Sequence, residues 1–431
     1  MFTSIENLYK LFCQHSVICS DSRNIKPNSI FFALKGENFN GNKFAESAIQ
    51  NGAEYAVIDE EVYKNSDRFL LVENVLETFQ QLAGYHRKKL NLPVIGITGT
   101  NGKTTTKELI AAVLKQKYKV VATSGNLNNH IGVPLTVLGI SKETEIAIIE
   151  MGANHIGEIS ELCNISRPDF GIITNIGKAH LEGFGSIEGI IKAKSELYKF
   201  ISKTEGLIFV NNDNKILKQL TKYLQTITYG TSENSDCQAK LIACDPYVEI
   251  LWDSKFGDVS IKSNLPGKYN FENILTAVCV GDYFNIKIEN IVRAIEEFIP
   301  KDNRSQFINT GKNKILLDAY NANPSSMEAA IRNFAELNYK NKILIIGDML
   351  ELGSESFPEH RNILEFIQKL GFNNVFLIGN EFNQANKNTK HKTFHKTEEA
   401  LQWFKTNRLE DATILIKGSR GIKLEPLVEV L

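Results

Sequence analysis

Short apolar segments alternate with helix-like segments along most of the 431-residue chain. Runs that are hydrophobic throughout, such as LPVIGIT at 92–98, are typical of parallel strands buried on both faces. Apolar positions spaced three or four residues apart, as in TTTKELIAAVLKQK at 104–117, predict helices that cover such strands. The repeated order of strand and helix predicts an α/β fold with mostly parallel sheets.

The pattern changes twice along the chain and so predicts three domains. Near the N-terminus, short apolar runs such as SIFFAL (29–34) and AEYAVID (53–59) are separated by polar turns, which predicts a small α/β domain. We place the predicted domains at 1–91, 92–303 and 304–431.

The second and third predicted domains differ in the kind of sheet they indicate. The second contains the strand-like runs EIAIIE (145–150) and FGIITNI (170–176), and a more polar stretch near 205–265 predicts additional strands. After PKDNRSQ (300–306), strands and helices alternate regularly, which is the pattern of a doubly wound, Rossmann-like sheet.

Composition narrows the class of protein. Hydrophobic residues make up 42% and charged residues 23%, as in ordinary globular proteins. With 49 Lys and Arg against 50 Asp and Glu, there is no basic excess to indicate nucleic acid or an anionic membrane as a partner. We expect no signal peptide and no apolar run near the ~20 residues that span a bilayer. The 6 cysteines form no CxxC pair and predict reduced thiols in the cytoplasm.

The segment GTNGKTT at 99–105 is the strongest candidate for a binding site. A standard P-loop has its first Gly five positions before the Gly-Lys pair, where this chain has Ile97, so the loop is shorter. Glycines let the backbone approach a ligand, and the first amides of the following helix attract phosphate. Lys103 would contact the β- and γ-phosphates, and the Thr104 hydroxyl would bind Mg²⁺. A plain glycine turn is the alternative, but it leaves Gly-Lys-Thr-Thr at a helix start unexplained.

Two further residues follow predicted strands and are candidates for a metal site. Glu150 ends a hydrophobic strand, where P-loop proteins commonly carry a metal-binding acid. His180 follows another strand in TNIGKAHLEGFGS (174–186). Taken alone, each has a structural interpretation: a solvated carboxylate at a strand end and a structural histidine. Together, beside a phosphate loop, they indicate a magnesium site.

The loop at 99–105 resembles the ATP-binding loop of the Mur ligases and their folylpolyglutamate synthase relatives, which use this short spacing. Further segments, in the expected order, resemble the branch of that family that uses D-alanyl-D-alanine. They are TSGNLNNHIGVPLTVL (123–138), EMGANHIGEI (150–159), DAYNANPSSM (318–327), GDMLELG (347–353) and IKGSRG (416–421).

The resemblance implies a fold and an activity. It implies a domain for the UDP end of the substrate, a central ATPase domain and a C-terminal Rossmann-like domain. ATP and Mg²⁺ would be the cofactors, and UDP-MurNAc-tripeptide and D-alanyl-D-alanine the substrates, joined through an acyl phosphate to give UDP-MurNAc-pentapeptide, ADP and phosphate. It also implies a cytoplasmic monomer of peptidoglycan precursor synthesis.

Roles for single residues are implied in the same way. Phosphate transfer would depend on Lys103, Glu150, His180 and Lys194. ATP would be bound by Gly99, Thr100, Asn101, Gly102, Lys103, Thr104, Thr105, Asn270, Asn273, Arg304 and Asp318. The other substrates would be bound by Ser22, Arg23, Asn126, Asn128, Asn129, Asn321 and Asn323. The metal ligands would be Thr104, Glu150, His180 and, if carbamylated, Lys194.

Some positions depart from the family pattern or allow a second interpretation. Asn42 stands where the family usually has His, and Tyr269 where it often has His, although a tyrosine ring can still stack on adenine. From the sequence alone, Lys194 is a surface lysine on a charged helix; the resemblance implies a carbamylated one. DAYNANP (318–324) would close over ATP and the dipeptide, but it also fits a turn and a helix start.

Other functions stay open at this point. They are a sister ligase that adds the third peptide residue, a folylpolyglutamate synthase, a nucleotide-gated binding protein and a catalytically silent copy. NANPSSM (321–327) with GNLNNHIGVP (125–134) argues against the first two. The combination of Lys103, Glu150, His180 and Lys194 argues against a pure sensor, which has no need for a second metal site.

Overall fold

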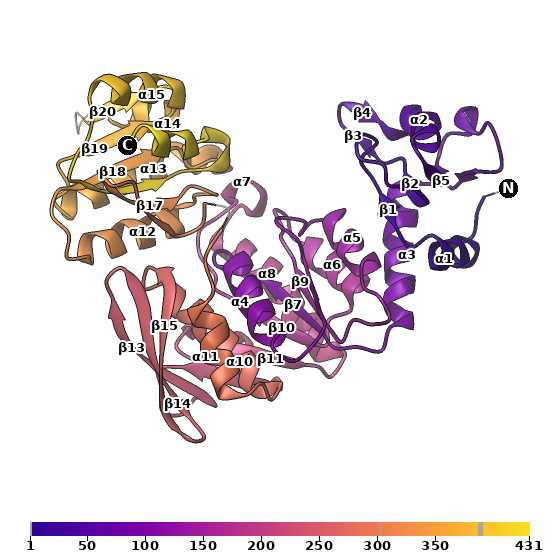
Figure 1. Cartoon of the computed structure of the whole chain (residues 1–431), viewed down its shortest axis with the longest axis horizontal. Coiled ribbons are helices and arrows are strands. Elements are labelled where there is room, and N and C mark those ends of the chain that lie inside the picture. Colours follow the sequence, from indigo (N-terminus) through magenta and orange to yellow (C-terminus); the bar gives the residue numbers. More distant parts are fainter. Residues whose placement is uncertain (1, 302, 387–390) are drawn as a thin grey trace.

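The computed structural model describes residues 2–301, 303–386 and 391–431. Three α/β units, each with its own main sheet, form an open arc with the N-terminal and C-terminal units at its two ends (Figure 1). Within these residues, no helix has both the length and the apolar character needed to cross a membrane.

The N-terminal unit is built on a four-stranded parallel sheet of order β1-β2-β5-β6, as the predicted small α/β domain requires. Its strands are β1 (Ile18–Cys19), β2 (Ser29–Phe32), β5 (Ala53–Ile58) and β6 (Phe69–Leu71). A short antiparallel ribbon is formed by β3 (Lys35–Gly36) and β4 (Phe39–Asn40). The helices are α1 (Ile5–Gln14), α2 (Ala45–Gln50) and α3 (Val75–Lys89), with 3₁₀ turns η1 (Gly41–Phe44) and η2 (Glu61–Tyr63).

The central unit contains a nine-stranded sheet of order β15-β14-β13-β12-β11-β10-β7-β9-β8. Its strands are β7 (Val94–Thr98), β8 (Val120–Ala122), β9 (Ile146–Glu150), β10 (Phe170–Ile173), β11 (Leu207–Asn211), β12 (Thr226–Gly230), β13 (Cys237–Cys244), β14 (Tyr247–Ser254) and β15 (Gly257–Pro266). The strands predicted near 205–265 are therefore confirmed. Pairing is parallel from β8 to β13, whereas β13, β14 and β15 form an antiparallel meander.

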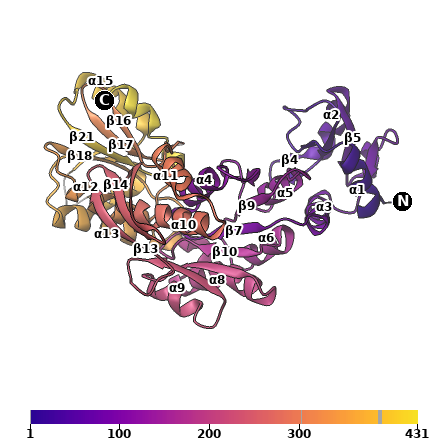
Figure 2. The same cartoon turned by 60° about the horizontal axis from the view of Figure 1, so that its bottom comes forward.

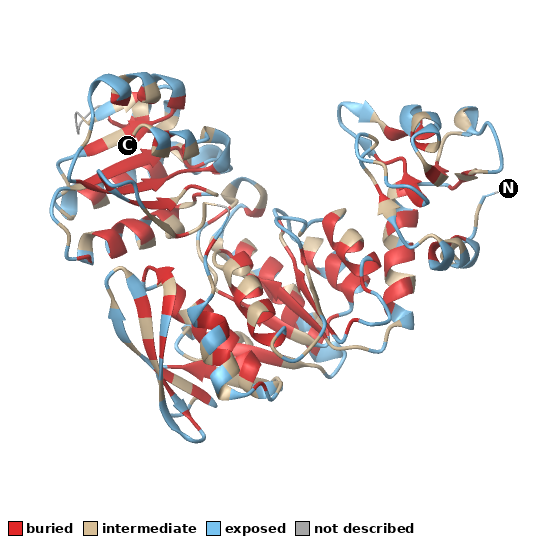
Figure 3. Cartoon of the chain, in the orientation of Figure 1, coloured by how far each residue is buried: buried red, intermediate tan, exposed pale blue. Residues whose placement is uncertain are grey.

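Helices cover both faces of this sheet, which explains why β7 and β9 are hydrophobic throughout (Figure 3). The helices are α4 (Lys103–Leu114), α5 (Gly132–Leu138), α6 (Glu158–Ser166), α7 (Leu181–Phe184), α8 (Ile187–Lys203), α9 (Lys215–Leu220), α10 (Asn270–Tyr283) and α11 (Ile288–Glu296). One core contains side chains of α4, α10 and α11, and another contains side chains of α5, α6 and α8.

Helix α3 connects the N-terminal unit to the central one. Leu82 of α3 belongs to the same hydrophobic core as residues of α5 and α6. Near the end of α3, the guanidinium of Arg87 donates to the carbonyl oxygens of Ser166 at 2.9 Å and Arg167 at 3.0 Å, and to the carboxylate of Asp169 at 2.9 Å. These contacts join residues on both sides of the predicted boundary after residue 91. They do not test where the boundary lies, so it stays a prediction.

Replacing Arg87 with methionine is expected to lower the free energy of unfolding by about 3 kcal/mol. The substitution removes the donor from two buried or half-buried carbonyl oxygens, and each unsatisfied group costs ~1–3 kcal/mol. Urea unfolding followed by circular dichroism measures the loss. Lys88→Met, at an exposed neighbouring position, is the control and should be within about 0.5 kcal/mol of the wild type. Equal effects of the two substitutions would contradict this role of Arg87.

The C-terminal unit has a six-stranded sheet of order β16-β17-β21-β18-β19-β20, parallel except for β16. Its strands are β16 (Gln306–Asn309), β17 (Lys314–Asp318), β18 (Lys342–Gly347), β19 (Val375–Ile378), β20 (Lys392–Phe394) and β21 (Thr413–Lys417). The helices are α12 (Pro324–Glu336), α13 (Ser356–Lys369), α14 (Asn380–Ala385) and α15 (Thr397–Thr406), with η3 (Gly353–Glu355), η5 (Arg420–Ile422) and η6 (Glu425–Glu429). Cores on both faces confirm the predicted doubly wound architecture.

The central and C-terminal units lie next to each other, and loops at the carboxyl ends of their parallel strands meet (Figures 1 and 2). This edge of a parallel sheet is where ligands bind in α/β proteins. The N-terminal unit stands apart from the C-terminal unit in both views.

Candidate active site

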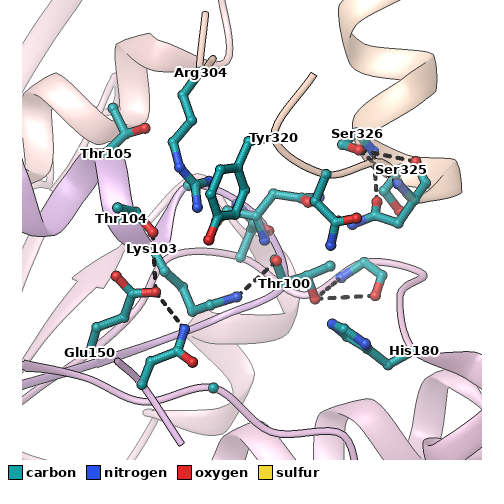
Figure 4. A pocket seen from close by; sticks show the side chains of 18 of the residues that line it. Thr100, Lys103, Thr104, Thr105, Glu150, His180, Arg304, Tyr320, Ser325 and Ser326 are labelled. Atoms are coloured by element: carbon teal, nitrogen blue, oxygen red, sulfur yellow. Dashed lines mark hydrogen bonds between the residues drawn. The ribbon is translucent and has the colours of Figure 1, made fainter. Parts of the chain in front are cut away.

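A cavity of about 910 Å³ lies between the central and C-terminal units (Figure 4). Most residues that the sequence predicted for the site line it, although they come from separate parts of the chain. They are Thr100, Asn101, Gly102, Lys103, Thr104, Thr105, Asn126, Asn128, Asn129, Glu150, His180, Asn270, Asn273, Arg304, Asp318, Asn321 and Asn323. The predicted residues outside the lining are Ser22, Arg23, Gly99 and Lys194.

The turn between β7 and α4 requires its two glycines. Gly99 has a φ of 141° and Gly102 a φ of 79°, which side-chain-bearing residues rarely adopt. A Cβ at Gly99 would lie 2.1 Å from the hydroxyl of Thr174, and one at Gly102 would lie 2.6 Å from Oδ1 of Asn273. The loop therefore has a defined backbone conformation that requires both glycines. A plain glycine turn would require them too, so phosphate binding by these residues stays a prediction.

Asn101, at the tip of the loop, is held from two domains. Its amide donates to Oδ1 of Asn175 at 3.0 Å, and its carbonyl accepts from the Thr174 hydroxyl at 2.6 Å. Its side-chain oxygen accepts a hydrogen bond from Nδ2 of Asn323, in the C-terminal unit, at 2.8 Å. Asn323 also caps α12, since its Oδ1 accepts from the amide of Ser326. The helix-start interpretation of DAYNANP is thus confirmed, and the same asparagine reaches the phosphate loop.

The ammonium of Lys103 faces the cavity and forms no ion pair with an acidic residue in the part of the chain that the structure describes. Its ammonium donates to the carbonyl oxygens of Gly99 at 2.8 Å and Thr100 at 3.1 Å. Burial lowers the pKa of Lys103, and the nearby charge of Glu150 opposes that shift. An anionic ligand in the cavity would supply the missing opposite charge.

Arg304 is a second such cation, and an aromatic ring holds it. Its guanidinium carbon lies 3.5 Å from the ring centroid of Tyr320, and its Nε has no hydrogen-bond partner (Figure 4). In contrast, Lys417 is paired with Asp318 at 2.6 Å. Among the described residues that line the cavity, Lys103 and Arg304 are thus cations left for an anion.

Removing the Tyr320 ring is expected to weaken ADP binding. Tyr320→Leu should raise the Kd for ADP about fivefold to tenfold, because a partly buried cation–π contact contributes ~1 kcal/mol or more. Tyr320→Phe keeps the ring and should bind nearly as the wild type. Isothermal titration with both variants measures the difference. Equal losses in both would mean that the hydroxyl, not the ring, is responsible.

Glu150 is buried, so the alternative of a solvated carboxylate is wrong, and its role as a metal ligand stays a prediction. Only 1% of the residue is exposed, and its Oε1 accepts from the Thr104 hydroxyl at 3.1 Å and from Nδ2 of Asn128 at 2.8 Å. Its Oε2 has no hydrogen-bond partner. A buried carboxylate next to a hydroxyl is the kind of oxygen donor set that Mg²⁺ prefers. No group of three or more His, Cys, Asp or Glu side chains in the described ranges could hold a metal by itself.

His180 contacts the C-terminal unit. It has a left-handed backbone conformation, with a φ of 48°, and its Nδ1 lies 2.6 Å from Oε2 of Glu351, without hydrogen-bond geometry. Nearby, the ammonium of Lys178 lies 2.7 Å from the carboxylate of Glu359. The role of His180 as a metal ligand stays a prediction. The sequence did not suggest Glu351 as its acidic neighbour.

Lys194 is buried, so the surface-lysine alternative is wrong. It lies on α8, only 2% exposed, with its ammonium 3.4 Å from the carbonyl oxygen of Ala153 and over the ring of Phe184. Burial is the main cause that lowers the pKa of Lys194 to about 7, and the charge of Lys103 adds to it. Ala153 lines the cavity, so Lys194 lies just behind its wall.

The asparagines of α10 are mostly engaged within the protein. Nδ2 of Asn270 donates to the carbonyl of Pro266, and Nδ2 of Asn273 donates to Oδ1 of Asn270 at 2.8 Å. Oδ1 of Asn273 accepts from the hydroxyl of Thr106 at 3.0 Å. These contacts support the phosphate loop from behind. Direct contacts of the two asparagines with ATP stay a prediction, as does stacking by Tyr269.

The residues predicted to bind the UDP end lie in the N-terminal unit. Arg23 is 88% exposed at its side chain and pairs with Asp21 at 2.9 Å. Neither Ser22 nor Arg23 lines the cavity between the other two units. Asn42 is buried, and its side chain exchanges two hydrogen bonds with Asp59, which accounts for its presence without a ligand.

Sequence reasoning missed several residues that form the site. Asn175 shapes the phosphate loop, Tyr320 and Lys417 line the C-terminal side, and Glu351 meets His180. Tyr320, Glu351 and Lys417 lie inside the segments DAYNANPSSM, GDMLELG and IKGSRG. Their place in these segments was the signal in the sequence that could have identified them as site residues. Their partners could not be read from it.

Comparisons with known proteins identify the same family over almost the whole chain. Three family models match: the Mur ligase family catalytic domain at 15–121, the Mur ligase middle domain at 97–281, and the Mur ligase glutamate ligase domain at 303–420. The UDP-N-acetylmuramoyl-tripeptide–D-alanyl-D-alanine ligase of Bacillus subtilis is 36% identical over 96% of this chain and 92% of its own length. The Escherichia coli ligase of the same name is 32% identical over 96% and 93%.

Solved structures give the same result. MurF from Acinetobacter baumannii superposes with a TM-score of 0.86 at 31% identity, covering 96% of this chain and 92% of that one. The MurF ligase of Thermotoga maritima, solved in complex with ADP, superposes with a TM-score of 0.85 at 28% identity, covering 96% of both chains.

Proposed function

Because this chain belongs to the Mur ligase family, we propose that it is the ATP-dependent ligase that joins D-alanyl-D-alanine to UDP-N-acetylmuramoyl-tripeptide. Relatives that carry this name are 32–36% identical over nearly the whole chain. The observation that carries the proposal is the meeting of the phosphate loop with the C-terminal unit, through Asn101 and Asn323. A nucleotide in the loop thus faces the segment that would receive the dipeptide.

The reaction has two steps that the cavity can accommodate. The tripeptide carboxylate takes the γ-phosphoryl group of ATP, giving an acyl phosphate and ADP, because a free carboxylate is a poor electrophile. The amino group of D-alanyl-D-alanine then attacks the acyl carbon, and phosphate leaves with the bonding electrons of the carbon–oxygen bond. The nitrogen loses one proton as the amide forms, and the leaving phosphate can accept it. Lys103 and Arg304 offset the charge of the phosphates, which is the main catalytic requirement of phosphoryl transfer.

Mg²⁺ fits the donor set at the end of β9. The Thr104 hydroxyl and the carboxylate of Glu150 would hold it, and the bound ion would neutralise phosphate charge. His180 and a carbamylated Lys194 would contribute to a second ion. The lowered pKa of Lys194 supports this, because only a neutral amine adds CO₂, losing a proton as the carbamate forms.

Contacts between the central and C-terminal units support a closed reaction chamber. Lys178 is bonded through its amide to the Ser325 hydroxyl at 2.8 Å and through its ammonium to Glu359. Closure of this kind excludes water from a reactive acyl phosphate. The N-terminal unit, with Ser22 and Arg23, would hold the UDP end of the long substrate.

The proposal also covers the location of the protein, its oligomeric state and its domain bounds. All 6 cysteines are free, which supports a reducing, cytoplasmic location. We propose a monomer without a nucleic-acid partner, with domains at 1–91, 92–303 and 304–431 that correspond to UDP binding, ATP binding and dipeptide binding.

Offering different amines to the same reaction tests the proposed acceptor. Purified protein with ATP and UDP-MurNAc-tripeptide is given D-alanyl-D-alanine, D-alanine, L-lysine or L-glutamate, and the nucleotide products are weighed by mass spectrometry. The proposal predicts a product only, or overwhelmingly, with the dipeptide. A product with glutamate, or with lysine on a UDP-dipeptide substrate, would assign the chain to a different ligase. Parallel tripeptides with lysine or diaminopimelate define the third residue.

A further inference from the structure

Lys107 is a fully buried lysine that the proposed reaction does not use. It lies on α4, one helical turn after Lys103, and its exposed fraction is 0%. A buried ammonium needs opposite charge and hydrogen-bond acceptors, or it is strongly unfavourable. Its partners therefore indicate what it does.

Three contacts surround the Lys107 ammonium. It donates to the carbonyl oxygen of Thr123, lies 2.9 Å from Oε1 of Glu108, and lies 3.8 Å from Oε2 of Glu150. The hydroxyl of Thr123 in turn accepts from the amide of Glu150 at 2.9 Å. Lys107 thus connects α4, the segment after β8 and the end of β9.

The contact with Glu150 indicates a role for Lys107, because Glu150 is the proposed metal ligand. Oε1 of Glu150 already accepts from Thr104 and Asn128, whereas Oε2 has no hydrogen bond. Lys107 is the cation that pairs with this oxygen among the described residues. Lys103 also lies near Glu150, but its ammonium is bonded to two carbonyl oxygens of the phosphate loop.

We propose that Lys107 is a positioning residue for Glu150: its buried ammonium pairs with Oε2 and so fixes the carboxylate in the orientation in which Oε1 accepts from the Thr104 hydroxyl. At 3.8 Å, the ammonium is close enough to Oε2 for charge pairing and too far for a hydrogen bond. This inference rests on the proposed role of Glu150 in holding Mg²⁺. Partners of this kind typically change metal affinity about 10- to 100-fold.

Thermal unfolding of the metal-free and nucleotide-free protein tests the pairing. Lys107→Met is expected to lower the Tm by about 5 °C or more, because it leaves a buried carboxylate without its counter-ion. Adding Glu150→Gln to that variant should raise the Tm again, since the unpaired charge is gone. If Lys107 merely packs, the two substitutions will lower the Tm additively, and the proposal is overturned.

Metal binding tests the positioning. The affinity for Mn²⁺ in the presence of ADP, measured by electron paramagnetic resonance, should fall about tenfold or more in Lys107→Met. Lys115→Met, at an exposed position just after the same helix, should bind as the wild type. Unchanged affinity in Lys107→Met would overturn the proposal. Absence of Mn²⁺ binding in the wild type itself would instead count against the proposed function.

Discussion

Replacing Lys103 with methionine is expected to lower kcat/KM for ATP about 10³-fold while leaving the fold intact. Lys103 is one of the cavity cations without an acidic partner, so its charge is available to the phosphates. Removing one cation or donor from a phosphoryl- or acyl-transfer site typically costs 10²- to 10³-fold or more. The chain should still fold, because the two hydrogen bonds that are lost lie within one loop and join no distant segments, although the loss lowers the free energy of unfolding.

Steady-state phosphate release measures this effect, and thermal unfolding checks the fold. Lys115→Met provides a matched loss of one lysine from the end of the same helix and should keep the wild-type rate. A Lys103→Met variant within tenfold of the wild type would show that the loop does not act on the transferred phosphate.

Replacing Lys194 with arginine is expected to lower kcat as far as replacing it with alanine does, about 10²-fold or more. Arginine keeps the positive charge but cannot become a carbamate, so charge alone should not restore activity. Because the pKa of Lys194 is lowered to about 7, the amine is largely neutral above that pH and able to add CO₂. The kcat should therefore fall as the pH drops below about 7.

Carbon-13 NMR after addition of labelled bicarbonate tests the modification separately from the variants. The wild type should show a carbamate resonance that is missing in Lys194→Ala. Wild-type activity in Lys194→Arg, together with no carbamate resonance, would mean that a plain cation suffices at this position.

The sequence predicted those parts of the site that depend on local geometry. The strand β7, the short loop and the start of α4 lie next to each other in the chain, so glycine spacing and a Gly-Lys-Thr sequence were enough to place them. Asn323 is similar, because a cap followed by Pro324 marks a helix start wherever it occurs. The alternation of strands and helices likewise predicted the mostly parallel sheets of the central and C-terminal units.

What the sequence could not predict depends on packing between distant segments. Lys194 looked like a surface lysine, because the helix spacing does not reveal that Phe184 and Ala153 enclose it. The stacking of Tyr320 on Arg304 joins residues on either side of β16 and β17. The approach of His180 to Glu351 exists only because two separate sheets lie next to each other.

The most direct test of the central claim is phosphate release from ATP by the purified protein with UDP-MurNAc-tripeptide and D-alanyl-D-alanine, each omitted in turn. The account predicts that sustained release needs all three, with one dipeptide added to the nucleotide product for each phosphate released. Sustained release without the dipeptide, or none in the complete mixture, would contradict it.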